Sequence, residues 1–471
     1  MTISPCRSHT FVDYKYLNQL LLEIQENCHR NNNSKIVSIS LEIGLVDPLL
    51  VFDKFSQKNS KNFYFENRSN GEAIAAIDTV DKIEISGQDR FTKSEEFIKN
   101  CLKNIIPISD QNQTFSLPRF FCTFSFFDQH QTTDYPFPSA TVFLPAWQIA
   151  LKNNRCTLIM NKNINSSINI TKILDHLQRH LEIIKSLKNH SLNIDTFTLN
   201  LYKKITKNGE KFKTSVSSVL EIIHSNHLRK IVLADTLDVS LNHDFNLLQS
   251  LNNLRQLHPN CHVFSTSNGP GQKFIGARPE RVISIHKQQL ITDALAGSAP
   301  RGKTPTEDTT NANNLINSTK EKHEHKLVLD FITQHLSQLG LLPQFLAPRL
   351  RQLSNIQHLW TPISAAIPNN IHPLQIVAKL HPTPAVAGAA RDIACAKIRH
   401  YESFERGLYA APLGWVDGEG NCEFIVGIRS ALINGNHARL YAGAGIVAGS
   451  DPEKEFAEVQ LKLQALLKAL V

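Results

Sequence analysis

The C-terminal part of the sequence predicts a helix that carries acidic and basic side chains beside its apolar face. In the stretch YAGAGIVAGSDPEKEFAEVQLK, residues 441–462, the Ser-Asp-Pro triplet marks the helix start. Glu455, Glu458 and Lys462 follow at helical spacing, within roughly 60° of one another around the helix axis. A solvated edge with a Glu458–Lys462 ion pair explains this pattern. A charged site that faces a ligand also explains it, although this helix alone favours the solvated edge.

A second predicted helix, over residues 318–339, places an acid where a core is expected. Ser318 and Glu321 form a capping-box signal at its start. Its apolar stripe is formed by Leu327, Val328, Phe331 and Ile332. Glu324 projects onto the middle of that stripe, and a buried carboxylate is costly unless it is paired or bound to a metal. Together with the acids of the C-terminal helix, Glu324 predicts a shared oxygen-ligand site for Mg²⁺, which takes one or two carboxylates.

Two glycine-rich segments, AGAGIV (442–447) and ALAGSAPRG (294–302), allow two interpretations. Each is either a tight bend at the end of a strand or a place where backbone N–H groups approach the carboxylate of a ligand. Arg429 and Tyr409 can also hold a carboxylate, the arginine through a bidentate contact and the tyrosine through its hydroxyl. Each of these side chains taken alone also fits a structural role.

Lys230 and Glu280 are candidates for proton transfer. Lys230 opens the apolar run KIVLA, and Glu280 follows a proline that breaks another apolar segment. A lysine at a strand start is usually solvated, and Glu280 also fits an ordinary surface acid. If Lys230 is instead buried near a cation, its pKa falls and it becomes a candidate general base.

The composition limits the classes of partner. The chain has 471 residues, a formal net charge of +8, 41% hydrophobic and 20% charged residues, which is typical of a globular protein. Its Lys and Arg residues are scattered, which disfavours nucleic acid and allows a small anionic substrate. The eight cysteines form no CxxC pair and predict free thiols in a reducing cytoplasm. We expect no signal peptide at MTISPCRSHTFVDYKY, no membrane span and no obligatory protein partner.

The chain predicts an α+β fold with large antiparallel sheets, because strands and helices alternate without βαβ regularity. The texture changes near residue 205, so we divide the chain into an N-terminal region, 1–205, and a domain over 206–471. The segments read as strands are 35–43, 140–151, 229–241, 274–286 (a pair broken at Pro279), 288–302 (running into a glycine loop), 411–433 (a hairpin with an Asp-Gly turn) and 438–447. Residues 171–187 read as an amphipathic helix.

Taken together, these segments resemble the chorismate-utilising enzymes, and most of all the isochorismate synthases. The segments that carry the resemblance occur in the family's order: KIVLA, FIGARPERV, ALAGSAPRG, KHEHKLV, LHPTPAVAG, YESFERGLYAAPLG, EFIVGIRSALI and residues 441–462. Weaker matches in the N-terminal region are NFYFENRSNGEAIAAI, FSFFD and ATVFLPAW. The resemblance implies a single large chorismate-binding fold, with antiparallel sheets packed as a sandwich and surrounded by helices.

The resemblance also implies an activity: the Mg²⁺-dependent isomerisation of chorismate to isochorismate, for menaquinone or siderophore biosynthesis. Water adds to C2 as the C4 hydroxyl leaves, and no organic cofactor is needed. Matching positions would make Lys230 the general base and Glu280 the general acid. Glu324 and Glu458 would hold Mg²⁺, with Glu455 beside them.

The remaining matched positions would bind the substrate. Tyr409, Arg429 and the backbone of Gly443 and Gly445 would hold the enolpyruvyl carboxylate. The positions that would line the rest of the site are Gly297, Ser298, His358, Ala385 and Lys462.

The sequence departs from the family pattern at Arg278, Ala390 and Ala411, and FSFFD lacks the expected glycines. None of these departures removes a proposed chemical group. Salicylate synthase remains an alternative, because it would share nearly every residue named here and add pyruvate elimination. An anthranilate or aminodeoxychorismate synthase component I would usually show PIAGT in place of ALAGS, and a degenerate chorismate-binding protein would have lost the acids or Lys230.

Overall fold

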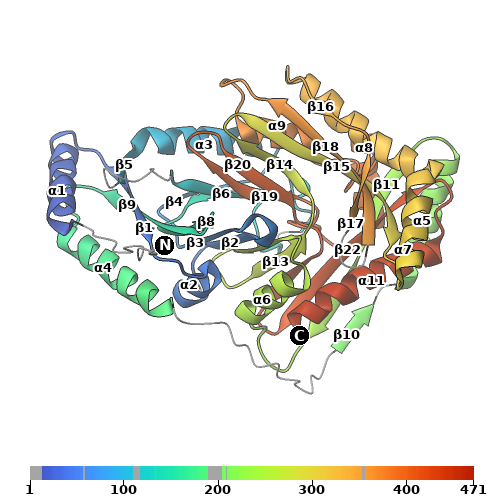
Figure 1. Cartoon of the computed structure of the whole chain (residues 1–471), viewed down its shortest axis with the longest axis horizontal. Helices are drawn as coiled ribbons and strands as arrows, with labels where there is room; N and C mark the ends of the chain where they lie inside the picture. Colours follow the sequence, from blue (N-terminus) through green and yellow to red (C-terminus); the bar gives the residue numbers. More distant parts are fainter. Residues whose placement is uncertain are drawn as a thin grey trace, which may run out of the picture.

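The apolar runs of the sequence form the strands of two large β-sheets, with helices around them (Figure 1). The computed structural model describes residues 13–56, 59–109, 117–132, 134–188, 204–207, 209–352 and 356–471. The strands of the 12-stranded sheet, in order of pairing, are β10 (Lys204–Lys207), β11 (Lys230–Ser240), β22 (His437–Val447), β21 (Ser430–Asn434), β13 (Lys273–Arg278), β12 (His262–Ser267), β2 (Asn62–Asn67), β3 (Glu72–Ile77), β8 (Trp147–Lys152), β9 (Arg155–Ile164), β1 (Lys35–Ile43) and β5 (Ile105–Ser109).

The second sheet has 10 strands. In order of pairing they are β16 (Gln344–Phe345), β18 (Ile356–Ala366), β15 (Gln289–Pro300), β14 (Arg281–His286), β20 (Cys422–Val426), β19 (Pro412–Asp417), β6 (Arg119–Phe124), β7 (Ala140–Leu144) and β4 (Asp81–Ile85), while β17 (Arg349–Gln352) also pairs with β18. In the described part of the chain, β1 and β5 are parallel, whereas the long pairs that carry the site, β11–β22 and β15–β18, are antiparallel.

The two sheets pack face to face. The ring centroids of Phe63 on β2 and Phe121 on β6 lie 5.0 Å apart, so side chains of the two sheets are in contact. His262 on β12 and Glu423 on β20 make a buried hydrogen bond of 2.7 Å across the same interface. These contacts confirm the predicted α+β fold with extensive antiparallel sheets packed as a sandwich.

Both sheets contain strands from both halves of the chain. In the first sheet β2 lies beside β12, and in the second β6 lies beside β19. The N-terminal strands therefore extend the same two sheets that carry the later strands. The division into regions 1–205 and 206–471 stays a prediction.

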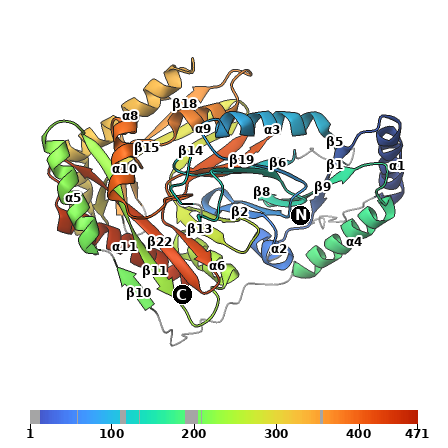
Figure 2. The same cartoon turned by 180° about the vertical axis from the view of Figure 1, so that it is seen from behind.

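Helices cover the outside of the sheets. The helices of the described residues are α1 (Tyr14–Arg30), α2 (Pro48–Phe55), α3 (Arg90–Asn104), α4 (Ile170–Leu187), α5 (Gly209–His224), α6 (Leu247–Leu257), α7 (Pro305–Asn317), α8 (Thr319–Ser337), α9 (Pro373–Leu380), α10 (Arg391–Tyr401) and α11 (Pro452–Leu470), with a short 3₁₀ turn at Arg68–Asn70. From behind, α5, α10 and α11 are seen beside β11 and β22 (Figure 2). These helices hold one end of the 12-stranded sheet, where the site lies.

Two local predictions were wrong, and each error has a physical cause. The segments on either side of Pro279 do not pair with each other, because β13 joins one sheet and β14 the other. Gly297 of ALAGSAPRG is not in a loop: β15 runs through it, with a register shift between Ala296 and Ser298, and only Gly302 lies beyond the strand. The strand predicted over 438–447 is confirmed as β22, and its glycines at 443 and 445 lie within the strand and not in a bend.

Other local predictions were confirmed. The Asp-Gly hairpin forms between β19 and β20, and the predicted helices form as α4, α8 and α11. The cysteines of the described residues are free thiols, while Cys6 and the proposed absence of a signal peptide fall on residues outside them. None of the helices in these ranges combines the length and apolar character needed to cross a bilayer.

Candidate active site

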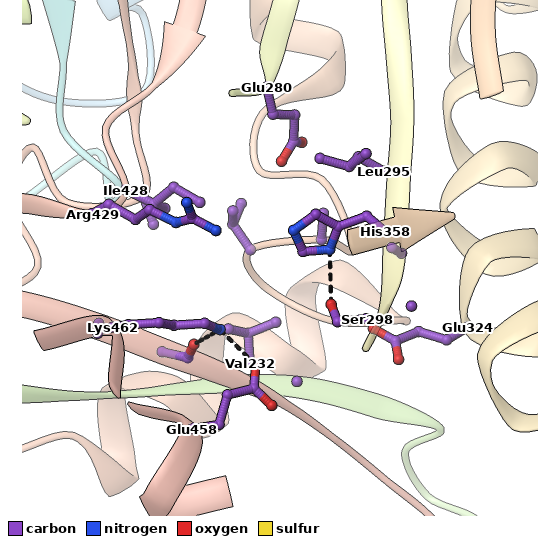
Figure 3. Close-up of a pocket in the computed structure, with 18 of the residues that line it drawn as sticks. Val232, Glu280, Leu295, Ser298, Glu324, His358, Ile428, Arg429, Glu458 and Lys462 are labelled. Atoms are coloured by element: carbon purple, nitrogen blue, oxygen red, sulfur yellow. Dashed lines mark hydrogen bonds and ion pairs between the residues drawn. The ribbon is translucent and has the colours of Figure 1, made fainter. Parts of the chain in front are cut away.

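One cavity brings together all of the predicted site residues. It has a volume of about 180 Å³ and lies among the ends of β11, β15 and β22, the loop before β21, and helices α8 and α11 (Figure 3). The predicted residues that line it are Lys230, Glu280, Gly297, Ser298, Glu324, His358, Ala385, Tyr409, Arg429, Gly443, Gly445, Glu455, Glu458 and Lys462. Their proximity is a structural fact, whereas the role of each remains a prediction.

Lys230 is buried at the start of β11 and is not solvated. Its side chain is 1% exposed, and its ammonium lies 2.6 Å from Oε1 of Glu324 on α8. Burial raises the pKa of Glu324, but the charge and hydrogen bond of Lys230 outweigh it and leave that pKa below its ordinary value. The acid that the sequence placed on an apolar face is therefore paired, as a buried carboxylate must be.

On α11, the predicted i,i+4 ion pair forms at the cavity wall. Nζ of Lys462 lies 2.7 Å from Oε1 of Glu458, and it also donates to the carbonyl oxygen of Gly443 at 2.9 Å. The side chains of Lys462 and Glu458 are 23% and 39% exposed. The pair is thus half-solvated and at the same time anchored to β22, so both initial explanations of this helix edge describe part of it.

The N–H groups of Gly443 and Gly445 point away from β11. In the β11–β22 ladder, Gly443 faces Ala234 and Gly445 faces Val232. The N–H of Ala234 donates to Glu402 and that of Val232 to Ala387, both outside the ladder. Opposed residues of an antiparallel pair direct their amides alike, either toward each other or away. Because β21 ends opposite Tyr441, the two glycine N–H groups face the side of β22 that borders the cavity.

Arg429 and Tyr409 contribute a cation and a hydroxyl. The guanidinium of Arg429 reaches into the cavity (Figure 3) and makes no hydrogen bond or ion pair with the described residues. Its backbone is left-handed, with φ 51°, a conformation that costs of order 1 kcal/mol for a residue with a side chain. Burial raises the pKa of the Tyr409 phenol, so this hydroxyl remains protonated and can donate a hydrogen bond.

Glu280 is a buried acid paired with an arginine. It follows β13 and forms an ion pair with Arg278, whose side chain is fully buried. Burial raises the pKa of Glu280 above its ordinary value, while Arg278 opposes that shift. A carboxyl group whose pKa is raised by burial can donate a proton nearer neutral pH than an exposed one.

The opposite wall is made by β15 and β18. Ser298 Oγ lies 2.8 Å from His358 Nδ1, and burial, reinforced by Arg429 and Lys462, lowers the pKa of His358 to about 3. The imidazole is therefore neutral at physiological pH. Gly297 has φ 78° at the bulge of β15, and a Cβ there would come within 3.2 Å of the backbone oxygen of Glu321. Ala385 completes this part of the lining.

Glu321 was missed as a site residue, because it was interpreted only as half of a capping box. Ser318 does cap α8 through the N–H of Glu321, at 3.3 Å. The Glu321 carboxylate instead accepts from the N–H of Ser298 at 3.0 Å and lines the cavity. The spacing of Glu321 and Glu324 on one helix face was the available signal. Lys320, Val232 and Leu295 also line the cavity without having been predicted.

The carboxylates fit a divalent cation without forming a compact metal centre. Within the described ranges, no group of three or more His, Cys, Asp or Glu side chains is arranged to hold a metal ion. Burial raises the pKa of Glu321, and the charges of Glu324 and Glu458 raise it further. Burial also raises the pKa of Glu455. A cation would relieve this repulsion, and Mg²⁺ requires only one or two carboxylates besides water and an anionic substrate.

The comparisons with known proteins identify the family. Residues 23–471 match the family model described as "Chorismate binding enzyme". The chain belongs to this family. The resemblance seen in the ordered sequence segments is thereby confirmed.

Individual relatives agree with this assignment. The isochorismate synthase MenF of Bacillus subtilis is 28% identical over 93% of this chain and 94% of its own length. The salicylate biosynthesis isochorismate synthase of Pseudomonas aeruginosa is 39% identical, but the match covers only 55% of this chain and 54% of that protein. The structure of the menaquinone-specific isochorismate synthase MenF from Escherichia coli superposes with a TM-score of 0.76 at 24% identity, over 96% of this chain and 100% of the other. At that identity the structural likeness concerns the fold.

Proposed function

We propose that this chain is an isochorismate synthase, an isomerase that converts chorismate to isochorismate. Water adds at C2 of the ring while the C4 hydroxyl leaves, so one water enters and one is released. The observation that carries the proposal is the single cavity that holds a buried lysine, a buried glutamic acid and an arginine without a partner among the described residues. The match of both family and near-complete relatives supports the same reaction.

Lys230 acts as the general base. Its amine, once deprotonated, takes a proton from the attacking water as the new C2–O bond forms. Glu280 lies across the cavity from Glu324, the partner of Lys230 (Figure 3). It donates a proton to the departing C4 hydroxyl, which leaves as water. Exchange with solvent then removes the proton that Lys230 took up and gives a proton back to Glu280.

The two carboxylates of chorismate bind to different groups of the cavity. Arg429, Tyr409 and the N–H groups of Gly443 and Gly445 bind the enolpyruvyl carboxylate. Lys462 adds a positive charge at this wall, where its ammonium donates to the carbonyl oxygen of Gly443. These contacts fix the ring so that C2 lies toward the base and C4 toward the acid.

Glu324 and Glu458 would hold Mg²⁺, and Glu321 and Glu455 line the same cavity. When bound, Mg²⁺ supplies positive charge that orients and neutralises the ring carboxylate. In the free protein Glu324 is paired with Lys230, so the proposed metal ligand and the proposed base are in direct contact.

The direct test is incubation of the purified chain with chorismate and Mg²⁺, followed by chromatography of the products. Isochorismate alone supports the proposal. Salicylate with pyruvate would assign salicylate synthase instead, and anthranilate in the presence of ammonium would assign an aminase. A folded, chorismate-binding chain without product would identify a degenerate binding protein.

The near-complete relatives favour the menaquinone branch over siderophore synthesis. The sequence match to the isochorismate synthase MenF of Bacillus subtilis covers 93% of the chain, whereas the sequence match to the vibriobactin-specific isochorismate synthase of Vibrio cholerae covers 55%. We propose a cytoplasmic enzyme because the cysteines of the described residues are free thiols, as in proteins of a reducing compartment. Deletion of the gene followed by quinone analysis, with and without added siderophore precursors, tests the branch.

A further inference from the structure

Arg278 is the departure from the family pattern that lies closest to the proposed chemistry. It is the last residue of β13, and its side chain has 0% exposure. Glu280 follows two residues later, and the two side chains form an ion pair. An arginine is seldom fully buried unless paired, so the ion pair with Glu280 is what compensates the buried charge of Arg278.

The guanidinium is fixed from a second direction. Nη1 of Arg278 donates to the carbonyl oxygen of Val426 at 2.9 Å. Arg278 belongs to the 12-stranded sheet and Val426 to the 10-stranded sheet, so the side chain spans the interface between them. A charged group anchored in this way holds the Glu280 carboxyl in one orientation at the cavity wall.

Two other charges near Glu280, those of Asp293 and Arg351, have partners of their own. Asp293 accepts from Arg281 at 3.0 Å and from Trp360 at 2.8 Å, and it lies 3.7 Å from Arg351. Arg351, Asp293 and Arg429 are the other charges that act on Glu280. Arg278 is the one in direct contact with Glu280, so its charge is the main one that opposes the effect of burial on the pKa of Glu280.

We propose that Arg278 is a positioning residue, which orients the Glu280 carboxyl toward the cavity and sets the pH above which that carboxyl no longer donates a proton. The inference rests on the proposed function, because the donor role of Glu280 belongs to it. Arg278 stabilises the carboxylate form, so it moves this limit toward lower pH. Without Arg278, burial acts alone and the acid keeps its proton to higher pH.

Two kinetic variants test this proposal. In Arg278→Met, we expect the pH at which kcat/KM falls on the alkaline side to rise by about 1–3 units, the shift that a contacting charge produces. In Arg278→Lys the charge is kept, so the limit returns toward wild type while kcat stays low because the fork geometry is lost. Arg255→Met removes a buried arginine that pairs with Asp47 outside the cavity, and it should keep the wild-type limit.

A second measurement does not depend on turnover. Infrared difference spectra against Glu280→Gln isolate the protonated carboxyl band of Glu280, and its titration should move upward in Arg278→Met. If that variant does not fold, Arg278→Gln retains a donor toward Val426 and replaces it. An unmoved titration overturns the proposal, whether or not the chain makes isochorismate. Absence of isochorismate from the wild-type chain, with the titration shifted, would overturn the proposed function alone.

Discussion

The ammonium of Lys230 and the carboxylate of Glu324 lie 2.6 Å apart and join the start of β11 to helix α8. The lysine is 1% exposed and the glutamate 16%, so the pair is largely removed from water. Removing one member of a buried pair leaves the other charge uncompensated, which costs about 3–5 kcal/mol. The proposed base and a proposed metal ligand are therefore coupled in the free protein.

Replacing Lys230 by Met removes the proposed base. We expect isochorismate formation to fall by about 10²–10⁴, the usual contribution of a general base. The fold should survive in Lys230→Met combined with Glu324→Gln, because neither charge is then left unpaired. Lys326→Met is the control, since Lys326 is exposed on α8 and pairs only with Asp330. Turnover near the wild-type rate in Lys230→Met would reject the base assignment.

Neutralising the proposed metal ligands should weaken Mg²⁺ binding. We expect Glu324→Gln and Glu458→Gln each to lower the affinity by at least about tenfold, since even indirect partners of a metal contribute that much. Calorimetric titration of Mg²⁺ measures this without turnover, and the Mg²⁺ dependence of activity should shift in parallel. Glu453→Gln is the matched control, because Glu453 lies on the same helix as Glu458, is 73% exposed and pairs with Lys213. Equal Mg²⁺ titrations for all three variants would contradict the metal site.

Much of the fold and site could be predicted because the informative residues stand inside well-marked elements. Lys230 begins a strand and Glu324 and Glu458 lie on helices, so their positions followed from local patterns. That they meet in one cavity could not be derived from spacing. The order of the family segments supplied it, because pairings such as β11 with β22 join residues far apart in the chain.

The parts that failed depend on contacts distant in sequence. Pro279 marks a break, but nothing local states that the chain crosses there from one sheet to the other. The strand over 438–447 was predicted, but a bend at Gly443 and Gly445 stayed open as an interpretation, and only the pairing with β11 excludes it. Glu321 carries a capping signal, while its contact with Ser298 arises from how α8 packs on β15.

A methyl group at Gly443 should impair substrate binding. A Cβ there would lie 2.9 Å from the Tyr409 hydroxyl and 3.0 Å from the Leu233 carbonyl oxygen, so both must shift. We expect Gly443→Ala to raise KM for chorismate by about tenfold, equivalent to about 1.4 kcal/mol. In Gly44→Ala the added methyl meets only the flexible end of Lys188, so KM should stay at the wild-type value. Steady-state kinetics measure both, and an unchanged KM in Gly443→Ala would show that this backbone does not contact the substrate.

The stability of the fold should fall in mild acid because of buried histidines such as His381. Burial, with Arg90 and Arg391 nearby, lowers the pKa of His381 to about 3, and its ring lies 3.1 Å from the Phe126 carbonyl oxygen. In the unfolded chain a histidine titrates near 6.5, so between about pH 6.5 and 3 the unfolded state binds the extra proton. The stabilising contribution is therefore complete above pH 6.5 and is lost as the pH falls.

Between pH 7 and pH 5, this residue should cost the wild type about 2 kcal/mol in free energy of unfolding, at 1.36 kcal/mol per pH unit below 6.5. In His381→Gln, which keeps a donor for Phe126, that part of the loss should disappear. Urea unfolding at both pH values measures the difference, and His224→Gln, an exposed position at the end of α5, should behave like the wild type. If His381→Gln loses as much stability as the wild type between these pH values, His381 is not the source of the acid sensitivity, because glutamine cannot take up a proton in the unfolded state.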